Sequence, residues 1–341
     1  MDGETDSRNT SNRGRMLRVI GVVGGLIVIS LGVITWFGLR PCNWLDSMLH
    51  ASGCIRTMPM REANDITYSP DGRTLAAATL DDEVRLWRVS DGELTGTLGR
   101  KRDYVELAYS PDGKTLAGGL LDGRVALLRV PDGAQLGPLI GEFNDSATSM
   151  VFSPDGHILV TGKNSGAILL WNVGDGSLIR TLVGHGGQVT QVVLSPDGRI
   201  LVSGSVDKTV RVWNVADGSL LQTMQCSEIV LGVGLSPDGQ TVAAGTFDDK
   251  LWLWNAKDGT SLRTLDARGG LMEKVAFTPD GKLAVAGYND GKVRVWSLDD
   301  GKLLRTFDGF SNGADYIAMA PDGQTVSISS YDGPIRLWQV R

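Results

Sequence analysis

The sequence predicts an all-β fold made of seven repeated four-stranded units, preceded by one membrane-spanning helix. Three observations lead to this prediction. A Ser-Pro-Asp-Gly tetrapeptide, or a near copy, occurs seven times at spacings of 41 to 43 residues. Each copy is followed eighteen residues later by a tryptophan or, once, by a leucine. Ahead of the repeats, residues 19–39 contain no charged side chain.

The uncharged segment at residues 19–39 has the length of a transmembrane helix. At 1.5 Å of rise per residue it would span about 31 Å, close to the thickness of a bilayer core. A cleaved secretory signal is the alternative, but small residues are missing around a cleavage point. Four arginines precede the segment and only Arg40 closely follows it. The positive-inside rule therefore places residues 1–18 in the cytoplasm and the rest of the chain outside it, with residues 40–53 as a tether.

Two cysteines flank this tether. Cys42 and Cys54 would lie in a compartment that permits disulfides if the predicted orientation holds. Their pairing is one hypothesis and two unpaired thiols are the other, because spacing alone does not fix a disulfide.

Each repeat reads as four short strands, which we call a, b, c and d. In the fourth repeat, the expected strands are residues 189–194, 200–203, 210–213 and 220–224. They alternate β-branched and aliphatic residues and are bounded by Pro, Asp and Gly, which is the pattern of strands and turns. The tetrapeptide at 195–198 then forms the turn between strands a and b, where Pro, Asp and Gly each suit a turn position. Its serine is therefore expected to be structural rather than a nucleophile.

Four-stranded repeats of this length are typical of the blades of a β-propeller. The tetrapeptides begin at Ser69, Ser110, Ser153, Ser195, Ser236, Thr278 and Ala320. The residues eighteen positions later are Trp87, Leu128, Trp171, Trp213, Trp254, Trp296 and Trp338. We therefore expect a seven-bladed β-propeller of four-stranded antiparallel blades across residues 54–341. The segment SPDGRILVSGSVDKTVRVWNVADGSLLQT resembles the WD-repeat family in its bacterial form, and this resemblance covers the same range.

The two ends of the repeat region predict how the ring closes. The last repeat stops directly after strand c, so its fourth strand is missing. The stretch CIRTM at 54–58 matches the regular strand d sequence LIRTL at 178–182. We expect this N-terminal strand to complete the seventh blade and to remove the exposed sheet edges.

Several family features are absent from this sequence. The Trp-Asp dipeptide never occurs, and the Gly-His pair appears once, at Gly184 and His185. The family's Asp–His–Ser/Thr–Trp hydrogen-bond network is therefore expected only in blade four. The aspartate of the turn between strands b and c persists, and outside blade four it is expected to cap its own turn. These structural aspartates are Asp81, Asp122, Asp207, Asp248, Asp290 and Asp332.

The composition offers little material for catalysis. The three histidines and three cysteines are not spaced as a triad or a zinc site, so we predict no catalytic, cofactor-binding or metal-binding residues. A net charge of −6 argues against binding to nucleic acid.

The resemblance implies a non-catalytic scaffold for protein–protein interaction. It places the b–c turns and the d–a loops on one side of the ring, which we call the top face. Aromatic and arginine residues in these divergent loops are the types that anchor interfaces, although each could instead pack between blades or be solvated. The candidates are Arg100, Arg102, Tyr104, Phe143, Tyr288, Phe310 and Tyr331, and Phe247 lies in the same loops. The alternative function is a small-ligand receptor or enzyme that uses the axial channel, and the alternative topology keeps the propeller in the cytoplasm.

Overall fold

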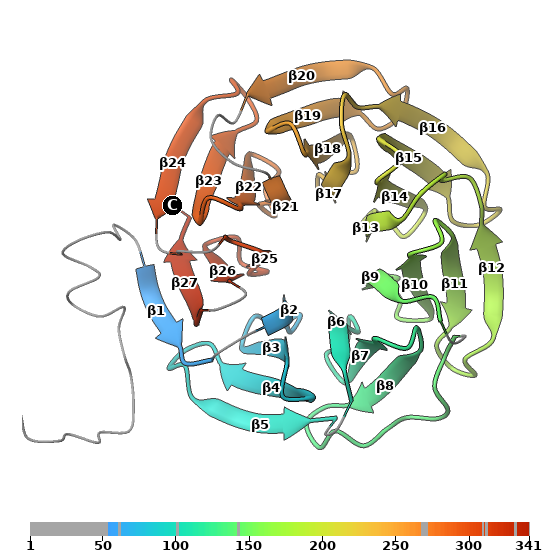
Figure 1. Cartoon of the computed structure of the whole chain (residues 1–341), viewed down its shortest axis with the longest axis vertical. Helices are drawn as coiled ribbons and strands as arrows, with labels where there is room; N and C mark the ends of the chain where they lie inside the picture. The colour runs from blue at the N-terminus through green and yellow to red at the C-terminus, as the bar shows by residue number, and fades with distance from the viewer. Residues whose placement is uncertain are drawn as a thin grey trace, which may run out of the picture. The chain divides into compact units, whose positions relative to one another are not determined.

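The computed structural model describes residues 54–340 except 61–62, 100–101, 142–143, 267–271, 309, 311–312 and 331–332. The predicted cytoplasmic tail, transmembrane helix and tether at residues 1–53 lie outside this range. Within it, no helix is long and apolar enough to cross a membrane. The described residues form seven antiparallel sheets, which stand as blades around a central axis (Figure 1).

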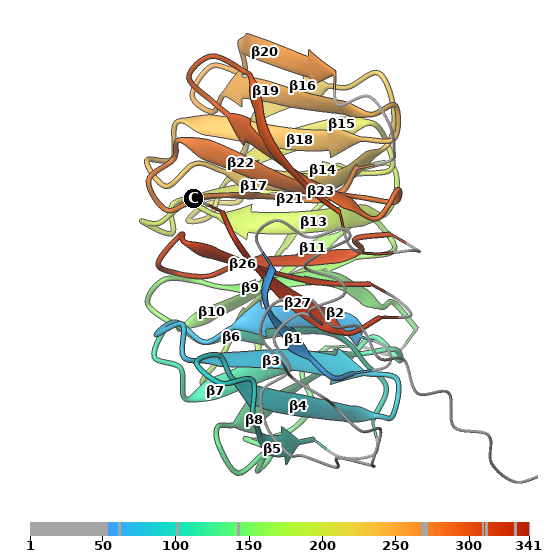
Figure 2. The ribbon, with the colours of Figure 1, turned by 90° about the vertical axis from the view of Figure 1, so that its left-hand side faces the viewer.

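Five blades contain four strands in chain order, with strand a innermost and strand d outermost (Figure 1). Figure 2 shows the same blades from the side. Blade one holds β2 (Ala63–Tyr68), β3 (Thr74–Thr79), β4 (Glu83–Arg88) and β5 (Leu94–Leu98). Blade three holds β9 (Ala147–Phe152), β10 (Ile158–Lys163), β11 (Ile168–Asn172) and β12 (Leu178–Leu182). Blade four holds β13 (Val189–Leu194), β14 (Ile200–Ser205), β15 (Thr209–Asn214) and β16 (Leu220–Gln225). Blade five holds β17 (Val230–Leu235), β18 (Thr241–Thr246), β19 (Lys250–Asn255) and β20 (Ser261–Asp266). Blade six holds β21 (Met272–Phe277), β22 (Leu283–Tyr288), β23 (Lys292–Ser297) and β24 (Leu303–Asp308).

Blade seven is built from both ends of the repeat region, as the sequence predicts. It contains β25 (Tyr316–Met319), β26 (Thr325–Ser329) and β27 (Ile335–Gln339), and β1 (Cys54–Met58) is its outer strand. Strand β1 pairs antiparallel with β27, with Thr57 opposite Arg336 and Met58 opposite Ile335. The predicted closure of the ring by an N-terminal strand is therefore confirmed.

Blade two departs from the predicted four regular strands. It contains β6 (Tyr104–Tyr109), β7 (Thr115–Leu120) and β8 (Val125–Arg129). In place of a fourth strand, the chain makes two isolated bridges, from Val125 to Ile140 and from Leu128 to Gln135. This stretch contains Pro138, which has no N–H to donate to a ladder, next to Gly137 at a φ of 74°. A regular outer strand is interrupted there for this reason.

The Ser-Pro-Asp-Gly turns have a structural role that they repeat around the ring. In blade four, Ser195 donates to the carboxylate of Asp197 at 2.6 Å and accepts the N–H of Ile200 at 2.9 Å. Gly198 has a φ of 70° and lies against Pro154 in the equivalent turn of blade three. Ser195 is only 3% exposed, so the interpretation of this serine as structural is confirmed.

The hydrophobic core is divided among the seams between adjacent blades. One cluster joins Trp87 of blade one to Met58, Ile335 and Leu337 of blade seven. Because each blade buries its apolar residues against its neighbours, the stability of each blade depends on the closed ring.

Candidate functional site

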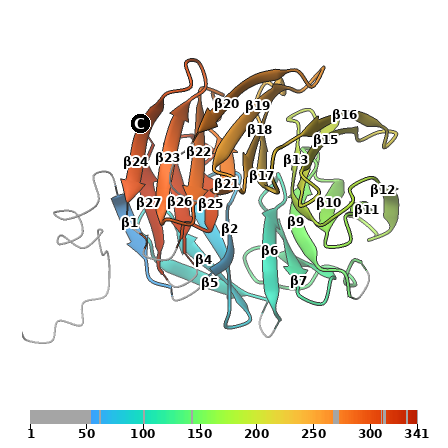
Figure 3. The ribbon, with the colours of Figure 1, turned by 45° about the horizontal axis from the view of Figure 1, so that its top comes forward.

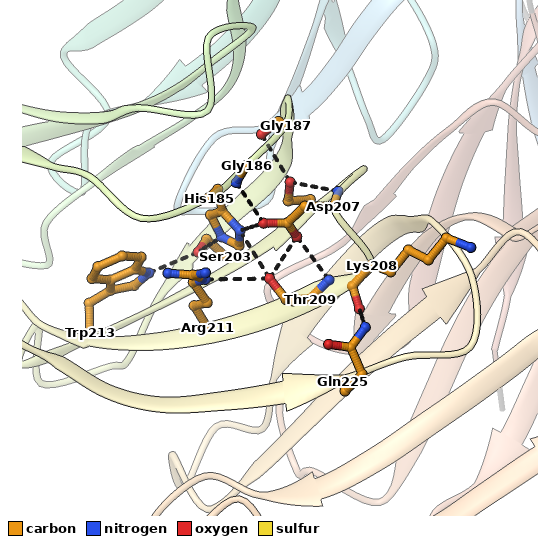
Figure 4. Close-up of polar contacts among 11 residues, drawn as sticks. His185, Gly186, Gly187, Ser203, Asp207, Lys208, Thr209, Arg211, Trp213 and Gln225 are labelled. Carbon is orange, nitrogen blue, oxygen red and sulfur yellow. Dashed lines mark hydrogen bonds and ion pairs between the residues drawn. The ribbon is translucent and has the colours of Figure 1, made fainter.

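Blade four contains the hydrogen-bond network that the sequence predicts (Figure 4). The ring of His185 joins Asp207 through Nδ1 at 2.9 Å and Ser203 through Nε2 at 2.7 Å. The indole Nε1 of Trp213 donates to the hydroxyl of Ser203 at 2.9 Å. The network ties the loop before strand a to strands b and c, and the expected Asp–His–Ser–Trp arrangement is confirmed.

The electrostatics of this network favour a neutral imidazole. Burial lowers the pKa of His185, although Asp207 acts in the opposite direction. Burial raises the pKa of Asp207, but hydrogen bonds from Thr209, the N–H of Gly186 and His185 outweigh it and bring the pKa to about 2. The carboxylate is thus ionised and accepts from Nδ1–H, which leaves Nε2 to accept from Ser203. With Ser203 and Trp213 engaged in the same chain, the histidine is structural.

Two further turn aspartates cap their own turns as predicted. The carboxylate of Asp122 accepts the backbone N–H of Arg124 at 3.0 Å, and that of Asp290 accepts the N–H of Lys292 at 3.0 Å.

The remaining turn aspartates use side-chain partners instead. Asp81 pairs with Arg85 at 2.8 Å. Asp248 pairs with Lys250 at 2.5 Å and also accepts from Ser227 at 2.6 Å. For Asp81 and Asp248, charged or hydroxyl donors therefore replace the predicted cap through a backbone N–H. Asp332 lies outside the described residues.

Of the seven predicted partner-binding residues, three lie outside the described residues, two are partly exposed and two are buried. Arg100, Phe143 and Tyr331 lie outside the described residues, so their role stays a prediction. Arg102 and Phe310 are partly exposed in loops of the top face and remain candidates.

Tyr104 and Tyr288 require a correction because both side chains are 0% exposed. The ring of Tyr104 fills the space above Gly118, and Tyr288 packs beneath the guanidinium of Arg294 with 4.2 Å between that group and the ring centre. Both tyrosines are core residues between strands in this structure, which was the alternative to partner contact.

The top face also carries exposed apolar residues. Leu80, Leu121 and Phe247 precede the turn aspartates of blades one, two and five and are 44%, 60% and 47% exposed. Val183, in the loop after β12, is 78% exposed. The sequence analysis did not predict that Leu80, Leu121 and Val183 are exposed. For the two leucines, the position directly before the turn aspartate would have indicated it.

The strands β2, β6 and β21 lie innermost in three blades (Figure 3), and each carries a charged side chain. Burial raises the pKa of Asp65 in β2 to about 6 and raises that of Glu106 in β6 well above its usual value, and Glu106 is also raised by Asp65. Lys274 in β21 lowers both. The two carboxyl groups therefore retain protons at a pH where isolated carboxyls have lost them.

Polar groups on the inner strands bond mainly to the next blade. Asp65 accepts the N–H of Leu107 at 2.8 Å, Ser149 that of Val192 at 3.2 Å, and Gln191 that of Val233 at 3.0 Å. This use of the side chains holds blades together and favours an architectural role over the alternative axial ligand site.

Other potential sites of chemistry are few in the part of the chain that the structure describes. No group of three or more His, Cys, Asp or Glu side chains is arranged there to hold a metal ion. Cys226 is buried, and burial raises the pKa of its thiol to about 12, so it is a poor nucleophile. Cys54 begins β1, but Cys42 is outside the described residues, and their pairing stays a prediction.

Comparison with known families supports the repeat assignment. The profile described as IFT122 first beta-propeller matches residues 146–341. The profile described as WD domain, G-beta repeat matches residues 52–88. No curated protein matches the chain.

Proposed function

Because the chain belongs to the IFT122 first beta-propeller family of WD40 repeats, we propose that it is a non-catalytic scaffold that binds protein partners through its top face. WD40 propellers are generally non-catalytic scaffolds of this kind. The repeated Ser-Pro-Asp-Gly turns further favour the bacterial form of the repeat.

One observation carries this proposal: four large apolar side chains are exposed in loops of the top face, whereas the other exposed ones among the described residues lie on the outer strands or, for Leu136, in the segment that replaces one. Leu80, Leu121, Val183 and Phe247 lie in turns or loops of the top face. The opposite face is formed by the Ser-Pro-Asp-Gly and Asp-Gly turns, whose side chains bond within their own hairpins. Exposed apolar groups among polar loops are a feature of protein-binding surfaces.

Photo-crosslinking in native membranes tests this function. We expect a photoreactive amino acid at Leu121 or Phe247 to give a discrete protein adduct. Probes at Arg199 and Lys114, which are exposed in the opposite turns, serve as matched controls and should give none. Equal labelling from both faces, or no adduct from the top face, would argue against the scaffold and turn attention to ligands of the axial region.

We also propose that residues 19–39 anchor the protein in a membrane, with residues 1–18 in the cytoplasm and the propeller outside it. The support is the uncharged span and the four arginines before it. Protease added to intact cells should then degrade the propeller and spare the N-terminal tail. Full protection of the propeller until the cells are lysed would show the inverted topology.

A further inference from the structure

Blade two differs from the other blades at positions that meet beside the seam with blade one. Leu128 stands where the other six blades have tryptophan. Tyr104 and Gly118 take the positions that Val189 and Ser203 hold in blade four. Because Gly118 has no Cβ, the ring of Tyr104 can lie over it, and an added Cβ would meet Tyr104 Cδ1 at 2.5 Å. The tyrosine ring therefore extends across β7 toward Leu128.

The hydroxyl of Tyr104 lies where blade four has the edge of an indole. A Cβ added to Gly99, in the loop before blade two, would meet this hydroxyl and also Leu128 Cδ1, the latter at 2.8 Å. A Cβ added to Gly184, in the loop before blade four, would instead meet Cη2 of Trp213 at 2.9 Å. Tyr104 is fully buried, and its hydroxyl has no hydrogen-bond partner among the described residues. A buried hydroxyl without a partner is costly, so this group is suited to bind a polar ligand.

A cavity of about 420 Å³ adjoins this hydroxyl. Gly99 and Leu128, which contact the tyrosine, line the cavity together with Tyr104 itself, and Thr97 of β5 lines it from blade one. It lies between the end of β5 and β8 (Figure 1). A volume of this size is typical of small-molecule sites, in which a few polar groups fix the orientation of the ligand.

The charges on the cavity wall favour an anion. Asp132 lines the cavity, but Arg129 pairs with it at 2.7 Å, lowers the pKa of its carboxyl and keeps it ionised. Arg102, also on the wall, forms no ion pair with any described residue and donates to the side-chain oxygen of Gln135 at 3.0 Å. Its positive charge is thus available to a ligand, and a further cation is disfavoured.

We propose that this cavity binds a small hydroxylated monocarboxylate, such as a sugar acid. The guanidinium of Arg102 binds the carboxylate, because its planar set of N–H groups fits two carboxylate oxygens. Hydroxyl groups of the ligand bond to the hydroxyls of Thr97 and Tyr104 and donate to the ionised Asp132. The same aspartate disfavours a phosphate dianion, which a single arginine does not neutralise. The site is separate from the exposed apolar side chains of the top face, so it does not depend on the function proposed above.

Saturation-transfer NMR on the full chain in detergent, titrated with D-glucuronate, tests the charge recognition. We expect glucuronate to bind about tenfold or more tightly than D-glucose, which has the hydroxyls but no carboxylate. Arg102→Gln should remove this preference, because it removes the charge and keeps a side chain that can form hydrogen bonds. Absence of glucuronate binding to the wild type, or equal binding of the two sugars, would overturn the proposal.

Tyr104→Phe tests the role of the buried hydroxyl. The substitution removes only a group without a partner, so the melting temperature should not fall, whereas the affinity for glucuronate should fall about fivefold. Tyr288→Phe makes the same change at the buried tyrosine of blade six and is the matched control, which should bind as the wild type does. Undiminished binding to Tyr104→Phe, or an equal loss in Tyr288→Phe, would contradict the assignment. The cross-linking of the top face is read out separately, so either proposal can fail alone.

Discussion

At the residue scale, the network around His185 shows how one blade differs from six near copies of itself. Ser203 accepts from Trp213 and donates to His185, so a single hydroxyl links the loop to strand c. Blades one and six have Ala77 and Ala286 at the position of Ser203. The backbone therefore tolerates the loss of the hydroxyl, but blade four relies on it because its histidine is buried.

We expect His185→Ala to lower the free energy of unfolding by about 2–3 kcal/mol, because it leaves Asp207 and Ser203 without a shared partner. Ser203→Ala should cost less, about 1 kcal/mol, since alanine occurs there in other blades. Urea denaturation followed by tryptophan fluorescence measures both. A loss for His185→Ala no larger than for Ser203→Ala would show that the network is not cooperative.

A buried lysine provides a second test at this scale. Lys163 is 2% exposed at the end of β10, and its Nζ donates to the carbonyls of Gly123 at 2.8 Å and Asp145 at 2.7 Å. It thus ties blade three to the turn between strands b and c of blade two. Lys163→Met keeps the length but leaves the carbonyls without these donors, so we expect a loss of about 3 kcal/mol in urea denaturation. An unchanged denaturation midpoint would show that water replaces the ammonium.

At the scale of elements, the inner strands of blades one and two meet through two carboxyl groups. Asp65 and Glu106 have raised pKa values because burial disfavours their charged forms, and Lys274 offsets this only in part. The same seam borders the blade without a regular outer strand.

This pair predicts a stability that falls as the pH rises. A carboxyl whose pKa is higher in the folded than in the unfolded state binds more protons when folded, so its stabilisation is complete below about pH 4 and is lost as the pH passes through 6. The change attributable to Asp65 is about 3 kcal/mol or less, since one pKa unit corresponds to about 1.4 kcal/mol. Glu106→Gln should flatten the decline measured by denaturation between pH 5 and 8. A slope identical to that of the wild type would contradict this account.

At the scale of the whole molecule, the ring is held at its closure by strand β1. This strand supplies the outer edge of blade seven, the core residue Met58, and the contact from Arg56 to blade one. Three kinds of interaction at one place make the closure cooperative with the rest of the ring.

Deletion of residues 54–58 should therefore destabilise all seven blades together. Hydrogen exchange would show faster exchange in blades three to five as well as in blade seven. The matched control is Thr95→Ala in β5, which removes one hydrogen bond to Leu86 and leaves the closure intact. An unchanged melting temperature after the deletion would show that blade seven is stable with three strands.

The sequence alone predicted the parts of this fold that repeat. Seven near-identical turns and the constant interval to the tryptophan determined the number of blades, because each is encoded within one local hairpin. The closure was predictable for a different reason: residues 54–58 repeat a strand d sequence, although their partner β27 lies at the other end of the chain. The histidine network was also predictable, since each of its four members occupies a fixed position in the repeat.

The tertiary structure decided what depends on two blades at once. Tyr104 and Tyr288 have the composition of interface residues, yet they are buried because Gly118 and Arg294 provide places for their rings. The cavity lined by Thr97, Tyr104, Leu128 and Gly133 is invisible in one repeat, because its walls come from two adjacent blades. Local sequence specifies hairpins, whereas burial and cavities arise from side chains that meet across a seam some forty residues apart.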